Sequence, residues 1–228
     1  TVICTKKRCE QIKGSKPKRL YIIHNTPRRV DFDETYQLKE NNNSDKKIKI
    51  AYIGILVNGR MLKEIIDLVA KDDRLELHIG GFGLLENYVK NMAKKNKNIY
   101  FYGRVPYHET LAIENKSDIL VAIYDPNVPN HKYSAPNKFY ESILLGKPII
   151  MAKNTGFDDI IYKYRIGLCI EYNKKSLKWG IENLIKQKNK WDEIERRGKL
   201  LYKEKFSWEI MEKRILAMYD DVLSDKRL

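Results

Sequence analysis

The distribution of apolar and polar positions becomes regular from residue 48 onward. Short apolar runs, which are typical of buried strands, alternate with segments whose apolar positions recur at helical spacing. We predict strands at 48–53, 75–79, 99–102, 119–124, 148–151 and 168–171. We predict helices at 60–70, 84–94, 108–114, 135–145, 158–164 and 176–187. Strands that alternate with helices in this way indicate an α/β fold with a doubly wound parallel sheet.

Less regular segments flank this core. Residues 1–26 predict a strand, a short helix and a second strand, whereas 28–47 is polar without apolar periodicity, so we interpret it as a linker. The segment 191–206 is charged and helical, and Ser207 is predicted to cap a last helix at 208–222. That helix carries an apolar stripe formed by Ile210, Ile215, Met218 and Tyr219.

The segment 117–152 shows the clearest local organisation. An apolar run leads into a loop rich in turn-forming residues. Ser134 then resembles a helix N-cap, and Pro136 lies inside the first turn. The helix ends at Gly146, and a second apolar run follows. A strand, loop, helix and strand in this order form the building block of a parallel sheet.

The turns after the strands are the expected place for a ligand. In doubly wound sheets, ligands bind beyond the carboxyl ends of the strands. Three earlier strands run into glycine at Gly54, Gly80–Gly81 and Gly103. We therefore expect these turns to lie along one edge of the sheet, together with 125–133 and 154–156.

Lys138 and Glu141 are the candidate chemical groups of the central segment. They are three residues apart just past a predicted helix N-terminus, so they share one helix face. A helix N-terminus attracts phosphate and Lys138 would add a full charge, while Glu141 could accept hydrogen bonds from sugar hydroxyls. The alternative is a solvated Lys–Glu pair worth a few tenths of a kcal/mol.

Composition limits the classes of function. The 228 residues carry a formal net charge of +14, with 43% hydrophobic and 32% charged residues, as in a globular protein with a sizeable core. The basic residues are spread along the chain and no nucleic-acid-binding motif is present, so we do not expect nucleic acid as a partner. Loose attraction to an anionic membrane surface is more plausible.

The expected location of the protein follows from what the sequence lacks. No apolar run approaches the length of a membrane span, and no signal-peptide pattern is present. The cysteines Cys4, Cys9 and Cys169 are odd in number and have no metal-ligand spacing. We interpret them as reduced thiols, which indicates a cytoplasmic protein. We also expect that the protein could bind peripherally to the inner face of a membrane.

One resemblance sharpens these expectations. The run SAPNKFYESILLGKPII, followed by Gly156 and Ile166–Gly167, resembles the nucleotide-sugar-binding domain of retaining glycosyltransferases with two Rossmann-like domains. These are the GT-B enzymes of the group 1, or family 4, type. The resemblance implies that Glu141 binds the ribose of the donor and that Lys138, close to Ser134, contacts its diphosphate. Many members carry an earlier glutamate, and Tyr133 occupies its position here, so we count Tyr133 and Ser134 among the candidate substrate-binding residues.

The resemblance also assigns roles to two turns. The segment around Gly54 resembles the first loop of the family, which carries basic residues for the diphosphate. Arg60 is the only cation in this loop, and the alternative role for it is a surface arginine at a helix start. Gly103, Arg104 and Val105 resemble the turn that contacts the base. No metal-binding cluster is found in the sequence, so we expect no metal and no cofactor, with the nucleotide sugar as a substrate.

The same family suggests a division of the chain. Residues 1–27 resemble the end of the acceptor-binding domain, 28–47 the linker, 48–206 the nucleotide-sugar-binding domain and 207–228 the helix that crosses back. Most of the acceptor-binding domain is then missing, together with acceptor-side catalytic residues that we cannot name. His24 is more plausibly structural than catalytic, and the edges of the N-terminal strands favour self-association.

We therefore predict the donor-binding part of a retaining glycosyltransferase. The full enzyme would transfer a sugar from a UDP- or GDP-linked donor to a hydroxyl of a glycan or lipid-linked acceptor, in the synthesis of a surface polysaccharide such as capsule or lipopolysaccharide. The chain alone is expected to bind nucleotide weakly and to turn nothing over. Two alternatives remain: a sugar-nucleotide epimerase or hydrolase of the same architecture, and a non-catalytic nucleotide-binding module.

Overall fold

The computed structural model describes residues 1–28, 36–39 and 47–224. Its centre is a six-stranded, entirely parallel sheet with the strand order β5-β4-β3-β6-β7-β8. The strands are β3 (Ile48–Ile55), β4 (Leu75–Phe82), β5 (Ile99–Phe101), β6 (Ile119–Ala122), β7 (Ile149–Ala152) and β8 (Gly167–Ile170). The doubly wound α/β fold predicted from the sequence is confirmed.

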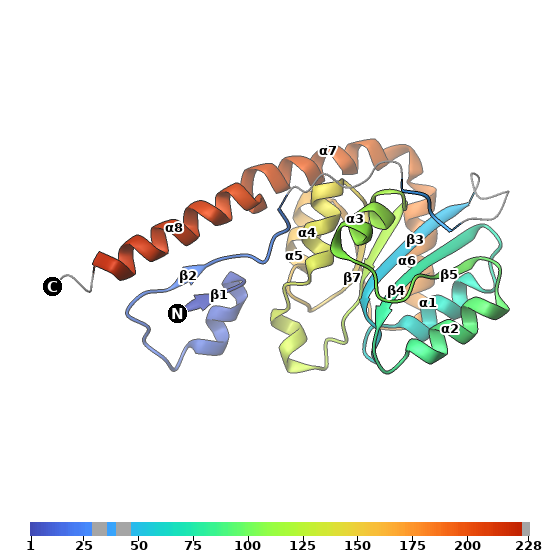
Figure 1. Cartoon of the computed structure of the whole chain (residues 1–228), viewed down its shortest axis with the longest axis horizontal. Coiled ribbons are helices and arrows are strands. Elements are labelled where there is room, and N and C mark those ends of the chain that lie inside the picture. The colour runs from blue at the N-terminus through green and yellow to red at the C-terminus, as the bar shows by residue number, and fades with distance from the viewer. Residues whose placement is uncertain (29–35, 40–46, 225–228) are drawn as a thin grey trace.

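Helices cover both faces of the sheet (Figure 1). One face packs against α1 (Leu62–Val69), α2 (Glu86–Lys95) and α6 (Lys174–Lys186). The other packs against α3 (Tyr107–Asn115), α4 (Asn137–Leu145), α5 (Asp158–Tyr164), α7 (Trp191–Leu201) and the π-helical turn η5 (Tyr202–Phe206). Short 3-10 turns lie at η3 (Pro129–Tyr133) and η4 (Lys188–Lys190).

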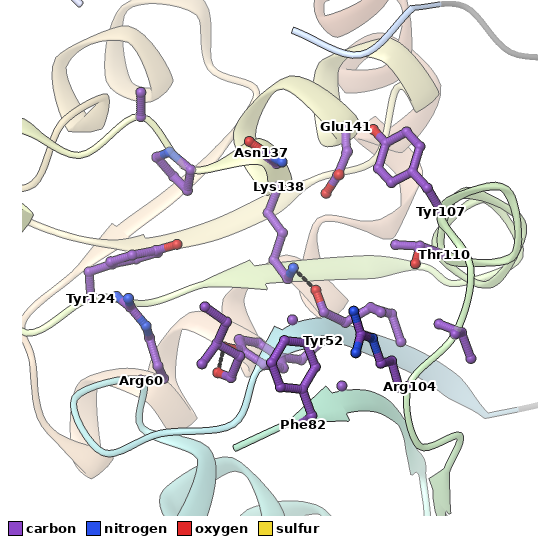
Figure 2. Close-up of a pocket in the computed structure, with 17 residues that line it drawn as sticks. Tyr52, Arg60, Phe82, Arg104, Tyr107, Thr110, Tyr124, Asn137, Lys138 and Glu141 are labelled. Carbon is purple, nitrogen blue, oxygen red and sulfur yellow. Dashed lines mark hydrogen bonds between the residues drawn. The ribbon is translucent and has the colours of Figure 1, made fainter. Parts of the chain in front are cut away.

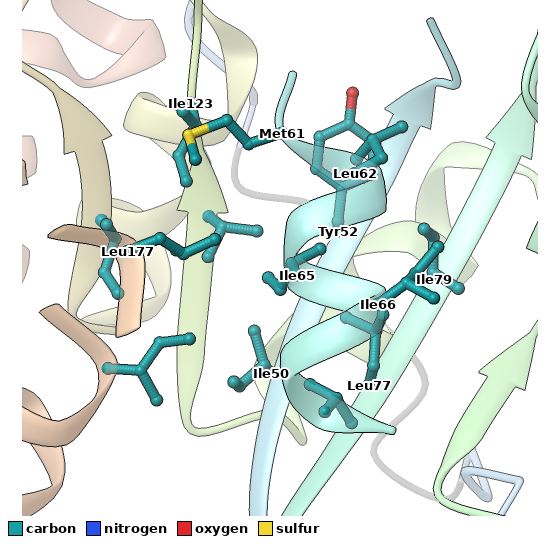
Figure 3. Close-up of a cluster of buried hydrophobic side chains, with 14 of the residues drawn as sticks. Ile50, Tyr52, Met61, Leu62, Ile65, Ile66, Leu77, Ile79, Ile123 and Leu177 are labelled. Carbon is teal, nitrogen blue, oxygen red and sulfur yellow. The ribbon is translucent and has the colours of Figure 1, made fainter. Parts of the chain in front are cut away.

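Alternation along the strands explains the two layers. Ile50 and Tyr52 of β3 belong to the cluster under α1, whereas Ala51 between them belongs to the cluster under α4. Successive strand side chains point to opposite faces, so a strand covered on both faces is apolar throughout. Figure 3 shows α1 laid over β3 and β4, with Ile65 and Ile66 directed into the sheet.

The N-terminal residues and the last helix lie beside this domain. Strands β1 (Val2–Ile3) and β2 (Tyr21–Ile22) form a separate two-stranded parallel sheet, with the 3-10 turn η1 (Lys6–Ile12) between them. Helix α8 (Trp208–Ser224) extends away from the six-stranded sheet and runs alongside β2 (Figure 1). The Tyr21 hydroxyl donates to the Asp221 carboxylate at 2.9 Å, and Arg214 donates to the carbonyl of Ile22 at 3.1 Å.

Most of the apolar stripe predicted on the last helix is half-buried, namely at Ile210, Ile215 and Met218. Met211 is the one buried residue described in α8, while Tyr219 is 57% exposed. The predicted linker lies mostly outside the described residues. Its residues 36–39 pack on the domain, where Leu38 contacts Ile53 and Ile113.

Two predicted helix starts are wrong. Ser134 does not cap α4: it is extended at the end of η3, and Pro136 occupies the N-cap position with φ −68° and ψ 136°. The residue before a proline disfavours helical geometry, so the helix begins only after Pro136. Arg60 does not begin α1, because Met61 adopts a left-handed conformation with φ 53° and the helix starts at Leu62. Arg60 therefore lies in the turn before the helix.

Candidate functional site

A cleft of about 400 Å³ lies where β3, β4, β5 and β6 end and where α4 begins. Its walls combine charged, aromatic and glycine residues from these turns, as Figure 2 shows. Six of the eight residues predicted from the sequence line it: Gly54, Arg60, Arg104, Val105, Lys138 and Glu141. The expected convergence of the strand-ending turns at one edge is therefore found in the structure.

Lys138 projects from the first turn of α4 across the cleft to the end of β3. Its Nζ donates a hydrogen bond to the carbonyl of Ile53, drawn as a dashed line in Figure 2. The same nitrogen is 5.0 Å from the centre of the Tyr52 ring. Burial opposes the charge of Lys138, but the negative charge of nearby acidic groups, that of Glu141 first, outweighs it, so the pKa of Lys138 is raised. Lys138 is therefore a fixed cation that faces the cleft.

Glu141 lies one helical turn deeper than Lys138. It is 2% exposed, and its Oε2 is buried without a hydrogen-bond donor among the described residues. Burial raises the pKa of Glu141, which the nearby Lys138 charge partly offsets. The Tyr107 side chain lies beside Glu141, and burial together with this carboxylate raises the pKa of Tyr107. A buried carboxylate oxygen with free acceptor capacity suits a ligand that brings hydroxyl groups.

Arg60 is held at the opposite end of the cleft from Glu141. Its guanidinium carbon is 3.4 Å from the centre of the Tyr124 ring, which places the cation flat on the aromatic face. Arg60 also donates to His131 Nε2 at 3.3 Å. His131 Nδ1 lies 2.8 Å from the carbonyl oxygen of Asp125, which can only accept, so Nδ1 carries the proton and Nε2 is the acceptor. The turns after β3 and β6 are thereby joined.

The third wall comes from the turns after β4 and β5. The guanidinium carbon of Arg104 is 4.9 Å from the centre of the Phe82 ring, and Phe82 is 47% exposed at the mouth of the cleft. Val105 lines the cleft beside Arg104. A cation and an exposed aromatic ring side by side provide a flat, polarisable surface of the kind on which bases stack.

Tyr133 and Ser134 are not brought to the cleft. The Tyr133 hydroxyl donates to Glu10 of the N-terminal turn at 3.4 Å. Ser134 is buried, with its carbonyl against Gly156, and its hydroxyl has no partner among the described residues. These two positions therefore shape the approach to α4 from outside the cleft.

His24 lies in an aromatic cluster behind α4. Its Nδ1 is 2.9 Å from the Tyr140 hydroxyl, and its ring packs edge-on against Phe206 with centres 4.9 Å apart. Burial, with a smaller effect of Arg214, lowers the pKa of His24 to about 4. A neutral imidazole packed among aromatic rings agrees with the structural role expected for it.

Several cleft residues were not found from the sequence. They are Tyr52, Phe82, Tyr107, Thr110 and Tyr124. The spacing of Tyr107 and Thr110 puts them on one face of α3, and this was a usable signal. The aromatic residues gave none, because a single tyrosine or phenylalanine near a turn is more often part of the core.

Two further observations concern metals and membranes. In residues 1–28, 36–39 and 47–224, no group of three or more His, Cys, Asp or Glu side chains is placed to hold a metal ion. Among the helices of the same ranges, none combines the length and apolar character needed to cross a membrane.

The fold and the cleft together define a class of protein: a doubly wound α/β domain with a cationic ligand cleft at the carboxyl ends of its strands. Residues 33–201 match the family model "Glycosyl transferases group 1". The chain belongs to this family. Its fold is that of the C-terminal half of the GT-B architecture of retaining glycosyltransferases.

A curated relative agrees with the family. An uncharacterised glycosyltransferase of Methanocaldococcus jannaschii is 26% identical over 155 residues, which cover 63% of this chain. The match covers 37% of that protein. The chain thus corresponds to little more than a third of the length of this relative.

Solved structures give the same fold. Sucrose-phosphate synthase from Thermosynechococcus elongatus superposes with a TM-score of 0.74 at 13% identity, over 98% of this chain and 58% of that one. A glycosyltransferase from Rickettsia africae gives 0.72 at 15% identity, over 97% and 63%. HepE of Anabaena, solved in complex with UDP-glucose, gives 0.70 at 15% identity, over 96% and 63%. The chain spans about three fifths of the length of these proteins.

Proposed function

We propose that the cleft binds a nucleoside-diphosphate sugar and that the complete protein transfers the sugar to an acceptor hydroxyl. The observation that carries this proposal is the placement of Lys138 and Glu141 on successive turns at the start of α4, both directed into one cleft. A helix N-terminus with a lysine in its first turn suits a diphosphate, and a buried carboxylate suits ribose hydroxyls. Membership of the family and the UDP complexes of HepE support the same ligand class.

The cations define where the diphosphate would lie. Lys138 reaches the carbonyl of Ile53 beside Gly54, so it supplies charge at the end of β3 in a first loop whose own cation is Arg60. Arg60 is held on Tyr124 at the far side of the cleft. A diphosphate between these two groups would receive charge from both. The same charges would stabilise the diphosphate as leaving group when its bond to the sugar breaks.

The remaining walls assign the other parts of the donor. Glu141 with Tyr107 would hold the ribose, and Arg104, Val105 and the exposed Phe82 would receive the base. The base proposed is uracil, as in HepE, and GDP is the control that tests it. We propose no residue of this chain as a catalytic group for the acceptor.

The wider role is a further part of the proposal. We propose that the acceptor is a glycan or a lipid-linked sugar of a surface polysaccharide, and that the protein acts in the cytoplasm at the inner face of a membrane. One supporting observation is the net charge of +14, because exposed Lys and Arg side chains attract anionic lipid. The other is the structural likeness to WaaG, described as a glycosyltransferase of lipopolysaccharide biosynthesis, with a TM-score of 0.66 at 14% identity.

Calorimetric titration with UDP and GDP tests the donor site. We expect saturable binding of UDP, weakened at least about tenfold by Glu141→Gln and by Lys138→Met, since each removes one charged or bidentate contact. Lys153→Met is the matched control, because Lys153 is exposed and its charge pairs with Glu171 in a surface contact. Absence of binding to either nucleotide, or equal affinity in all variants, would refute the proposal.

A further inference from the structure

Glu114 is a buried carboxyl group directly behind the cleft. Tyr107, Thr110 and Glu114 follow one another at spacings of three and four along α3, so they share one helix face. The first two line the cleft. Glu114 continues this face beneath the surface and is fully buried.

The partner of Glu114 is another carboxyl group. Neither oxygen of Glu114 receives a hydrogen bond from a hydroxyl, amide or amine group of the described residues. Helix α3 packs against α4, and the carboxyl group of Glu141 on α4 interacts with that of Glu114. Two carboxylates in contact inside a protein repel each other and cannot both keep their charge without a large cost, so such a pair holds a proton.

The surroundings place that proton on Glu114. Burial, and then the charge of Glu141, raises the pKa of Glu114 well above its usual range, and the opposing Lys138 charge is a smaller effect. Glu141 is the better anion of the two, because the charge of Lys138 and the neighbouring Tyr107 and Glu114 side chains favour its charged form. Three more titratable groups lie nearby. Tyr52 of β3 and Tyr124 interact with Lys138, and Tyr202 of η5 interacts with Tyr107.

We propose that Glu114 is a positioning residue of the donor site: it stays protonated at neutral pH and donates a hydrogen bond that fixes the carboxylate of Glu141. The proposal rests on the proposed function, in which Glu141 receives the ribose. A carboxylate fixed from behind by Glu114 and from the side by Tyr107 keeps its remaining acceptor positions directed at the ligand.

The proton also sets the charge of the cleft. With Glu114 neutral, Lys138 and Glu141 balance each other, and Arg60 and Arg104 leave the cleft with a net positive charge toward a diphosphate. If Glu114 ionised, the pair would carry one more negative charge close to the ligand and lose its internal hydrogen bond. Binding should therefore weaken as pH rises through the pKa of Glu114.

Infrared spectroscopy tests the protonation directly, without any ligand. We expect the carbonyl band of a protonated carboxyl group in the wild type at neutral pH, its absence in Glu114→Gln, and its presence in Glu109→Gln, a matched change on the same helix. Absence of the band in the wild type, or its persistence in Glu114→Gln, would overturn the proposal.

Calorimetry with UDP-glucose tests the positioning role. This ligand is chosen because its diphosphate does not change protonation over the pH range in which Glu114 would ionise. We expect Glu114→Gln to keep affinity within about twofold, because its amide still donates to Glu141, and Glu114→Leu to lose at least about tenfold for want of a donor. Wild-type affinity should fall over the pH range in which the infrared band disappears, while that of Glu114→Gln stays constant.

The outcomes separate the two proposals. If the wild type shows the band but binds no UDP-glucose, the proposed function fails and the positioning role fails with it. If the wild type binds UDP-glucose but Glu114→Gln weakens binding as much as Glu114→Leu, or the band is lost with rising pH without a change in affinity, only the role of Glu114 is refuted.

Discussion

The Nζ atom of Lys138 lies 3.0 Å from the point that a β-carbon on Gly54 would occupy. The glycine at the end of β3 therefore leaves the space in which the cation of α4 meets the first turn of the sheet. Two segments far apart in the chain, the end of β3 and the start of α4, thus come into contact in the cleft.

Replacing this glycine should displace the cation without unfolding the domain. In Gly54→Ala the new methyl group meets the flexible end of a side chain, so we expect near wild-type stability and a loss of UDP affinity of about tenfold, the size of a misplaced charged contact. Gly14→Ala is the control, because nothing lies within 4 Å of a β-carbon there. Calorimetry and thermal unfolding of both variants would decide; equal UDP affinity would contradict the assignment.

The contact between Arg60 and Tyr124 should support UDP binding through the aromatic ring of Tyr124 and not through its hydroxyl group. In Tyr124→Leu the guanidinium loses the aromatic face, and we expect UDP affinity to fall about threefold to tenfold, the range of a partly buried cation–π contact. Tyr124→Phe keeps the face and should bind as the wild type does. Titration of the two variants in parallel is the measurement, and a loss in Tyr124→Phe as large as in Tyr124→Leu would point to the hydroxyl instead.

Close packing at Gly156 should make it a sensitive position for stability. A β-carbon there would lie 1.6 Å from the carbonyl oxygen of Ser134, so the backbone before α4 must move in Gly156→Ala. We expect a loss of about 3 kcal/mol in the free energy of unfolding, the upper end of the usual range for overpacked sites.

Gly198 provides the opposite case. It lies inside α7, and a β-carbon there has neighbours no nearer than 3.5 Å. Gly198→Ala should stabilise the protein by about 0.5–1 kcal/mol through helix propensity. Urea unfolding of Gly156→Ala and Gly198→Ala checks both signs, and a neutral Gly156→Ala would show that the Ser134 segment yields easily.

His24 should make stability depend on pH in the mildly acidic range. Its pKa is about 4 in the folded protein and about 6.5 in the unfolded chain, so the unfolded state binds more protons between these values. The contribution of His24 to the free energy of unfolding should then be fully present above pH 6.5 and should be lost as pH decreases toward 4. Because the side chain is only partly buried, we expect a loss of about 1–2 kcal/mol.

The comparison with His24→Gln isolates this contribution. Carboxylates titrate in the same range in both proteins, so the difference between their urea-unfolding curves at about pH 7 and pH 4.5 reports His24 alone. A difference that does not change with pH would show that His24 is freely protonated in the folded state.

The sequence predicted the order of the elements because burial on both faces makes each strand a continuous apolar run. Boundaries were less accurate where backbone conformation decides them. The left-handed Met61 moved Arg60 out of α1, and the extended Pro136 delayed the start of α4. Neither conformation leaves a trace in the pattern of apolar residues.

The candidate site was predicted in part, and the limit has a physical cause. Lys138 and Glu141 were found because they adjoin a recognisable helix start. Glu114 was missed because α3 is buried on several sides, from Thr110 to Glu114, so no polar face marks it off from an apolar one. A carboxyl group in such a helix becomes conspicuous only when the neighbouring helix places a second one beside it.

The strand order also determines when the cleft can form during synthesis. β3 pairs on one side with β4, which follows closely in the chain, and on the other with β6, where Ile50 lies opposite Ile119. The unit β3-β4-β5 can therefore assemble on the ribosome before β6 has been synthesised, while the other edge of β3 is still unpaired. Arg60, Phe82 and Arg104 belong to that early unit, whereas Lys138 and Glu141 emerge later. The cleft thus lies at the interface between the half of the domain that is synthesised first and the half that is synthesised later. A nucleotide bound in it would contact both halves and stabilise their association.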